Sequence, residues 1–166
     1  MIRTGAVAGL TLLLAGCGGE TATPAKVEKP RTLAAGEYEV LSEVTKLASV
    51  DKTTPATTLK MGGVEIIRAC VAADGTADPA MFNEKGDRCT VLHSFARAGR
   101  LSIQYSCKRG ATGEVYPNVD GDYTADGYKA LVTVGTAFTG DGDYTLTRTL
   151  TAKRIGACPA APPAKT

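Results

Sequence analysis

The chain has 166 residues, with 19 basic and 17 acidic side chains and a net charge of +2. A length of this order suits one domain. A balance so close to neutral argues against a nucleic-acid-binding or polybasic lipid-binding surface. Tryptophan is absent, histidine occurs once, and glycine and threonine are abundant, which favours strands joined by tight turns over helices.

The N-terminus predicts a secretory signal peptide. Arg3 supplies the positive charge, and the apolar run from Ala6 to Leu14 has the length of a signal core. This run is too short to span a bilayer, which takes about 20 apolar residues. It leads into Leu14-Ala15-Gly16-Cys17, which resembles the lipobox of bacterial lipoproteins. The resemblance implies a signal peptide over residues 1–16, cleavage before Cys17 and lipid on Cys17.

The lipobox also sets the expected location and the expected anchor. Gly18 follows the cysteine at the place where an aspartate often signals retention in the inner membrane. We therefore expect an outer-membrane anchor facing the periplasm, with several acyl chains on Cys17 giving a stable hold. The alternative is an ordinary signal peptide that leaves Cys17 as an incidental thiol.

Composition divides the remaining chain into three parts. Residues 17–35 combine Ala, Thr, Pro and Lys with almost nothing apolar, which predicts a lipidated cysteine followed by a flexible tether. Residues 36–158 form the predicted β domain. Residues 159–166 are rich in Pro and Ala and predict a disordered tail.

The domain opens with a clear strand pattern. From Gly36 onward, Tyr38, Val40 and Val44 alternate with glutamates, as in a half-buried strand. A second apolar run extends from Leu59 to Val71, with a bulge or turn expected at Gly62-Gly63.

The stretch 72–86 predicts a loop. It has room for one short helical turn, capped by Asp78 with Pro79 at its first position.

Residues 89–107 predict a hairpin with Arg97-Ala98-Gly99 as a three-residue loop. This register pairs Ala96 with Arg100, Phe95 with Leu101 and His93 with Ile103. It places Val91, His93 and Phe95 on one apolar face. Continued outward, it puts Cys89 opposite Cys107, within reach of a disulfide.

Three more strands are expected after the hairpin, separated by turns at residues 125–127 and 140–142. In the last of them the inward positions are Tyr144, Leu146, Leu150 and Ala152, with threonines outward. The predicted fold is therefore all-β: an antiparallel meander of about seven strands forming a curved sheet or a small barrel, stapled by disulfides.

No cofactor, metal or catalytic site is predicted. His93 is the one imidazole, and its place on an apolar strand face favours a core or rim role. The Asp-Gly pairs fail the spacing of a calcium loop, because counting twelve from Asp120 reaches Leu131 instead of a glutamate. These pairs are typical of hairpin turns.

An ordered set of short motifs suggests a family. The strand Gly36-Glu37-Tyr38-Glu39-Val40, single cysteines at 70, 89 and 107, and the ending Gly156-Ala157-Cys158 resemble the bacterial envelope proteins of domain-of-unknown-function family 3617. The resemblance implies secretion and brings no assigned reaction.

Four cysteines remain once Cys17 is assigned to lipid, and in an oxidising compartment they allow three pairings. With Cys89 paired to Cys107 across the hairpin, Cys70 and Cys158 are left to pair with each other. The other two pairings remain open.

We therefore expect a non-catalytic binding or structural module, held to the membrane through Cys17, that takes an envelope protein or a small apolar ligand and no nucleic acid. One alternative is a hydrolytic envelope enzyme using His93 or carboxylates. Another is a periplasmic inhibitor or chaperone-like factor.

Overall fold

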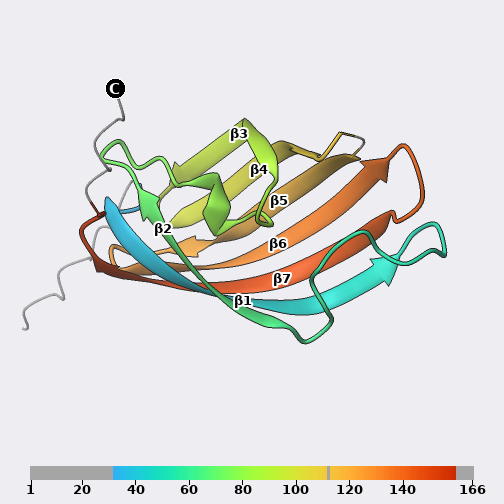
Figure 1. The fold of residues 1–166 in the computed structure, drawn as a ribbon. Coiled ribbons are helices and arrows are strands. Elements are labelled where there is room, and N and C mark those ends of the chain that lie inside the picture. Colours follow the sequence, from blue (N-terminus) through green and yellow to red (C-terminus); the bar gives the residue numbers. More distant parts are fainter. Residues whose placement is uncertain (1–31, 112, 160–166) are drawn as a thin grey trace, which may run out of the picture.

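The structure is a computed structural model that describes residues 32–111 and 113–159. These residues form one open, curved antiparallel sheet of seven strands in the order β2-β1-β7-β6-β5-β4-β3 (Figure 1). The strands are β1 (Gly36–Ser49), β2 (Val64–Val71), β3 (Arg88–Arg97), β4 (Arg100–Arg109), β5 (Gly113–Tyr123), β6 (Gly127–Phe138) and β7 (Tyr144–Gly156). This confirms the predicted all-β meander and decides for the open sheet over the closed barrel.

The signal peptide, Cys17, most of the predicted tether, and residues 160–166 of the predicted tail lie outside the described residues. Within residues 32–111 and 113–159, no helix is long and apolar enough to cross a membrane. The packed part of the chain reaches back to Leu33, which is buried. The hydroxyl of Tyr38 also donates to the carbonyl of Ala34 at 2.8 Å.

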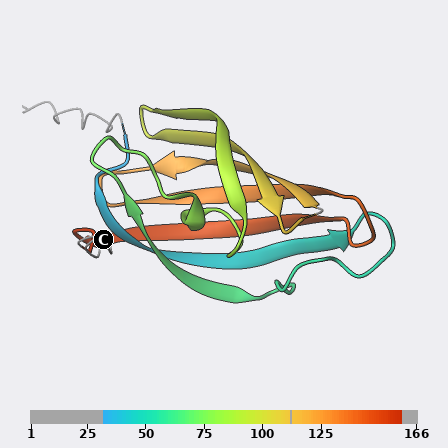
Figure 2. The same cartoon turned by 45° about the horizontal axis from the view of Figure 1, so that its top comes forward.

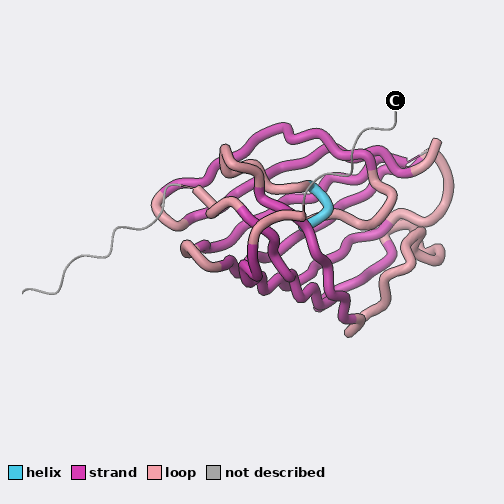
Figure 3. The backbone as a smooth tube through the Cα atoms, turned by 60° about the vertical axis from the view of Figure 1, so that its left-hand side comes forward, coloured by secondary structure: helices cyan, strands magenta, loops and turns pink. Residues whose placement is uncertain are grey.

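The connection from β2 to β3 gives the fold its second layer. These two strands lie at opposite edges of the sheet, so residues 72–87 cross its inner face (Figure 2). We call residues 72–87 the crossover. Its centre is the short helix η1 (Pro79–Met81), drawn in cyan in Figure 3. As predicted, Asp78 caps this helix, its carboxylate accepting from the backbone N–H of Ala80 at 2.8 Å.

The core lies between the crossover and the inner face of the sheet. Phe82 is fully buried, with its ring centroid 5.5 Å from that of Tyr128 and 6.1 Å from that of Tyr105. The predicted alternation is confirmed, since the inward positions of the first and last strands are all buried. These are Tyr38, Val40, Val44, Tyr144, Leu146, Leu150 and Ala152.

The β3–β4 hairpin differs from the prediction near its turn. Its loop has two residues, Ala98 and Gly99, both with positive φ (52° and 79°), the pattern of a type I′ turn. A β-bulge between Val91 and His93 then shifts the register by one residue and restores the pairing of the cysteines. The predicted three-residue loop was wrong because the tighter turn matches the strand twist better.

The bulge also changes which side chains share a face. The observed pairs are Ala96 with Leu101, Phe95 with Ser102 and His93 with Gln104. His93 is therefore on the opposite face from Val91 and is exposed to solvent. Its predicted core or rim position was wrong.

Two disulfides tie the sheet together. One joins Cys89 to Cys107, directly opposite each other on β3 and β4. The other joins Cys70 at the end of β2 to Cys158 after β7, across 88 residues of sequence. The second bond holds the C-terminal end of the domain to an edge strand.

Candidate functional site

A cleft of about 580 Å³ opens between β2 and the crossover. Its apolar lining includes Ile66, Ile67 and Pro79, and its charged lining is mainly carboxylates. A second hollow of about 430 Å³ lies on the other side of residues 84–87, against the segment 55–58. Residues 84–87 therefore form a wall shared by both hollows.

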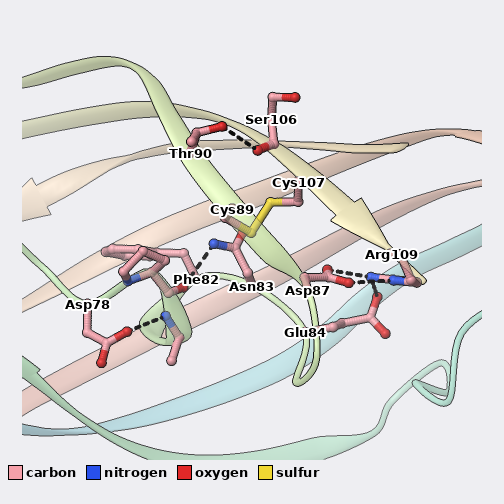
Figure 4. The surroundings of a disulfide bond; sticks show 12 residues. Asp78, Phe82, Asn83, Glu84, Asp87, Cys89, Thr90, Ser106, Cys107 and Arg109 are labelled. Carbon is pink, nitrogen blue, oxygen red and sulfur yellow. Dashed lines mark hydrogen bonds and ion pairs between the residues drawn. A yellow bond between two sulfur atoms is a disulfide. The ribbon is translucent and has the colours of Figure 1, made fainter. Parts of the chain in front are cut away.

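Arg109, at the end of β4, holds this wall in place. Its Nε and Nη2 each lie 2.7 Å from an oxygen of Asp87, and its Nη2 lies 2.9 Å from Oε1 of Glu84 (Figure 4). Burial opposes the charge of Arg109, but hydrogen bonding to Asp87 and the nearby Glu84 outweigh it and raise the pKa of the guanidinium. The arginine stays charged at every physiological pH.

Tyr144 completes the cluster from β7. Its hydroxyl donates to Oε1 of Glu84 at 2.7 Å and accepts a hydrogen bond from Arg109. Burial, reinforced by the charge of Glu84, raises the pKa of Tyr144 to about 12. Glu84 also accepts from the hydroxyl of Thr57 at 2.7 Å. The carboxylate oxygens of Glu84 and Asp87 are therefore all hydrogen-bonded within the protein.

A second arginine fastens the middle of the crossover. Arg148 is 1% exposed and lies on β7 between Val44 and Val132, in a row that is otherwise apolar. It donates to the carbonyl of Phe82 and, at 3.5 Å, to the hydroxyl of Ser42. Burial lowers its pKa, partly offset by the charges of Glu84 and Glu65.

Asn83, Glu65 and Asp78 contribute hydrogen-bond acceptors to the lining of the cleft. Asn83 is 6% exposed and its Oδ1 has no hydrogen-bond partner. Glu65 and Asp78 are exposed and form no ion pair in the described part of the chain. Lys85 is the one cationic side chain of the described cleft lining. Lys85 is also exposed and forms no ion pair in the described residues, so the unpaired charges of the cleft are two carboxylates and one ammonium group, with negative charge in excess.

His93, the one imidazole considered for catalysis, does not meet the carboxylates of the cleft. His93 lies on edge strand β3 and lines neither hollow. Within residues 32–111 and 113–159, no three His, Cys, Asp or Glu side chains are grouped so as to hold a metal ion. Tyr105, Tyr123, Tyr128 and Tyr144 are buried in the core.

Sequence reasoning missed the residues that build the site. One signal was present: in the alternation of the last strand, Arg148 occupies an inward position between Leu146 and Leu150. A charged residue at such a position predicts a buried polar contact, because burying a charge without partners is costly. Nothing local marks Glu84, Asp87 and Arg109 as a cluster, since they come from separate elements.

These features define a single open-sheet β domain with a crossover over its inner face and a charged cleft beside β2. The chain belongs to the family described as Protein of unknown function (DUF3617), which matches residues 33–158. No curated protein and no solved structure matches the chain significantly.

Proposed function

We propose that this chain is a lipid-anchored protein of the bacterial envelope that binds a small ligand carrying a protonated amine. The observation that carries the binding proposal is the presence in the cleft of two carboxylates without an ion pair in the described residues, Glu65 and Asp78. A carboxylate without a cationic partner forms a charge-assisted hydrogen bond with an ammonium group that a ligand brings.

The shape and charge of the cleft select the kind of ligand. Ile66, Ile67 and Pro79 suit a short alkyl chain, whereas the unpaired carboxylates suit an ammonium group. An alkylamine or polyamine satisfies both requirements. A purely apolar ligand, the alternative expected from the sequence, would leave the carboxylates of Glu65 and Asp78 without a cationic partner. The hydrolytic alternative that uses His93 is not favoured, because His93 does not line the cleft and so does not act beside its carboxylates.

Calorimetry with 1,4-diaminobutane tests this proposal. We expect binding of 1,4-diaminobutane and none of 1,4-butanediol, which has the same length without charge. Glu65→Gln should weaken binding by about fivefold, the value of one exposed ion pair. The matched control is Glu43→Gln, which removes the same charge from an exposed position on β1 outside the cleft lining. Equal binding of amine and alcohol would refute the proposal.

The anchor is supported by the lipobox sequence that ends at Cys17. Labelled palmitate should enter the wild-type protein, and Cys17→Ser should abolish the label and release the protein into the soluble fraction. Gly18→Asp should keep the label and move the protein from the outer to the inner membrane. Label on the Cys17→Ser variant would exclude this anchor.

A further inference from the structure

The two edges of the open sheet differ. The outer edge of β2 is partly covered by the crossover: Val71 forms a β-bridge with Ala77, and the N–H of Asp78 donates to the carbonyl of Cys70 at 2.9 Å. All ladder pairs of β3 in the described part of the chain are with β4. The outer edge of β3, Arg88–Arg97, therefore presents the outward N–H and C=O groups of alternate residues over about 30 Å at the usual rise of a strand.

The side chains of β3 are unusually apolar for an uncovered edge. Val91, Leu92 and Phe95 are 48%, 54% and 54% exposed. Natural proteins blunt such edges with prolines, lysines or bulges, because a free edge pairs with other chains. This strand contains neither proline nor lysine; it has the bulge between Val91 and His93, and its charged side chains are the arginines at its two ends.

The charges of β3 are all of one sign. The strand has no acidic residue and ends in Arg88 and Arg97, both exposed and without an ion pair in the described residues. The nearby acid Asp122, on β5, contacts Arg100 of β4 at 3.7 Å and forms no ion pair with Arg97. Two cationic ends therefore flank an apolar centre.

The strand is also held rigid before any partner arrives. The Cys89–Cys107 disulfide ties one end of β3 to β4, and the tight turn at Ala98 and Gly99 ties the other. A preorganised edge loses little conformational entropy on binding.

We propose that β3 is a docking edge for an extended segment of a partner protein, which adds to the sheet as an eighth strand and carries acidic residues at both ends. Main-chain hydrogen bonds supply affinity, and the two arginines select an acidic segment. A second copy of this chain fits poorly. Antiparallel pairing of β3 with itself would set Arg88 against Arg97 at both ends, and like charges facing each other destabilise a strand pair. This docking edge is separate from the cleft and does not rest on its ligand.

The test uses three ten-residue peptides and the amide resonances of the purified protein. The first alternates Val and Thr with Glu at both ends, the second has Lys at both ends, and the third is the first with alternate backbone amides N-methylated. We expect the Glu peptide to shift and protect amides of β3. We expect the Lys peptide to bind at least tenfold more weakly, and the methylated peptide to lose the protection because it cannot complete the ladder.

Charge reversal on the protein supplies the control. Arg88→Glu with Arg97→Glu should reverse the preference to the Lys peptide. Both side chains are exposed, so the fold should survive, as circular dichroism would verify. The matched variant, Lys129→Glu with Lys153→Glu, makes the same charge change on β6 and β7 and should keep the preference for Glu. The proposal would be overturned if the Glu and Lys peptides bound equally, or if the methylated peptide bound as well as the unmethylated Glu peptide. Self-association through β3 without peptide binding would also overturn it.

Discussion

Arg109 and Glu84 form an ion pair with Nη2 2.9 Å from Oε1, which joins the end of β4 to the crossover. The same guanidinium holds Asp87, whose side chain is 1% exposed. Removal of Arg109 would leave a buried carboxylate without a partner, a more serious loss than that of a surface contact.

We therefore expect Arg109→Met to lower the free energy of unfolding by about 3 kcal/mol, the cost of breaking a buried ion pair. The measurement is urea unfolding followed by circular dichroism. The control is Arg100→Met, which removes an ion pair whose two side chains are both 69% exposed. The free energy of unfolding of that variant should fall by less than about 1 kcal/mol. Similar losses in the two variants would show that the Arg109 cluster is not a buried anchor.

The two disulfides should differ in their contribution. Cys89 and Cys107 are 18 residues apart, whereas Cys70 and Cys158 are 88 apart. In the chain-entropy model the first bond stabilises by about 3 kcal/mol and the second by about 4.5 kcal/mol. We would replace both cysteines of each pair by alanine and measure urea unfolding. The variant without Cys70 and Cys158 should lose more free energy of unfolding than the variant without Cys89 and Cys107. A larger loss for the hairpin pair would contradict the model.

Asp51 should make the domain sensitive to acid. Its Oδ2 accepts from the backbone N–H of Gly142 at 2.7 Å and of Asp143 at 2.9 Å, joining the β1–β2 loop to the β6–β7 turn. Hydrogen bonds from the side chain and backbone of Thr53, with these two, hold the pKa of Asp51 well below its ordinary value. A carboxyl whose pKa is lower in the folded state stabilises the fold at pH values above its unfolded-state pKa of about 3.9. This stabilisation is lost as the pH falls towards the folded-state pKa.

Asp51→Asn should therefore lower the melting temperature at pH 7 and flatten its decline below pH 4. Scanning calorimetry at several pH values measures both effects. Asp141→Asn is the matched control, because Asp141 lies in the same turn and contributes none of these bonds. An acid decline as steep in Asp51→Asn as in the wild type would exclude Asp51 as its source.

Arg148 tests whether a buried cation is needed for stability. Its guanidinium contacts the carbonyl of Phe82 and the hydroxyl of Ser42, with Nε unpartnered. Arg148 forms no ion pair in the described residues, so its replacement by methionine leaves no carboxylate unpaired and removes the cost of burying a charge, which offsets the loss of its two hydrogen bonds. We expect Arg148→Met to change the free energy of unfolding by less than about 1 kcal/mol or to raise it. A loss of about 3 kcal/mol or more in urea unfolding would show that the contact with the crossover outweighs the cost of burying the charge.

The sequence by itself determined the local structure. Alternation of apolar and polar residues has a period of two, so Tyr38, Val40 and Val44 were readable as the buried face of the first strand. The Asp78-Pro79 start of the helical turn was equally readable, because a cap and a proline act within a few residues. These features depend on neighbours in the chain.

Tertiary structure decided the rest, because it depends on contacts between distant residues. The shift to a two-residue turn and a bulge exposed His93, although the pairing of Cys89 with Cys107 was readable from the sequence. The position of β2 and β3 at opposite edges sends the crossover over the sheet. The crossover then brings Glu84 to Arg109 and Phe82 to Arg148, and it leaves the Oδ1 of Asn83 unpaired beside the cleft. A local sequence pattern does not predict such contacts, since they form only when the whole sheet has folded.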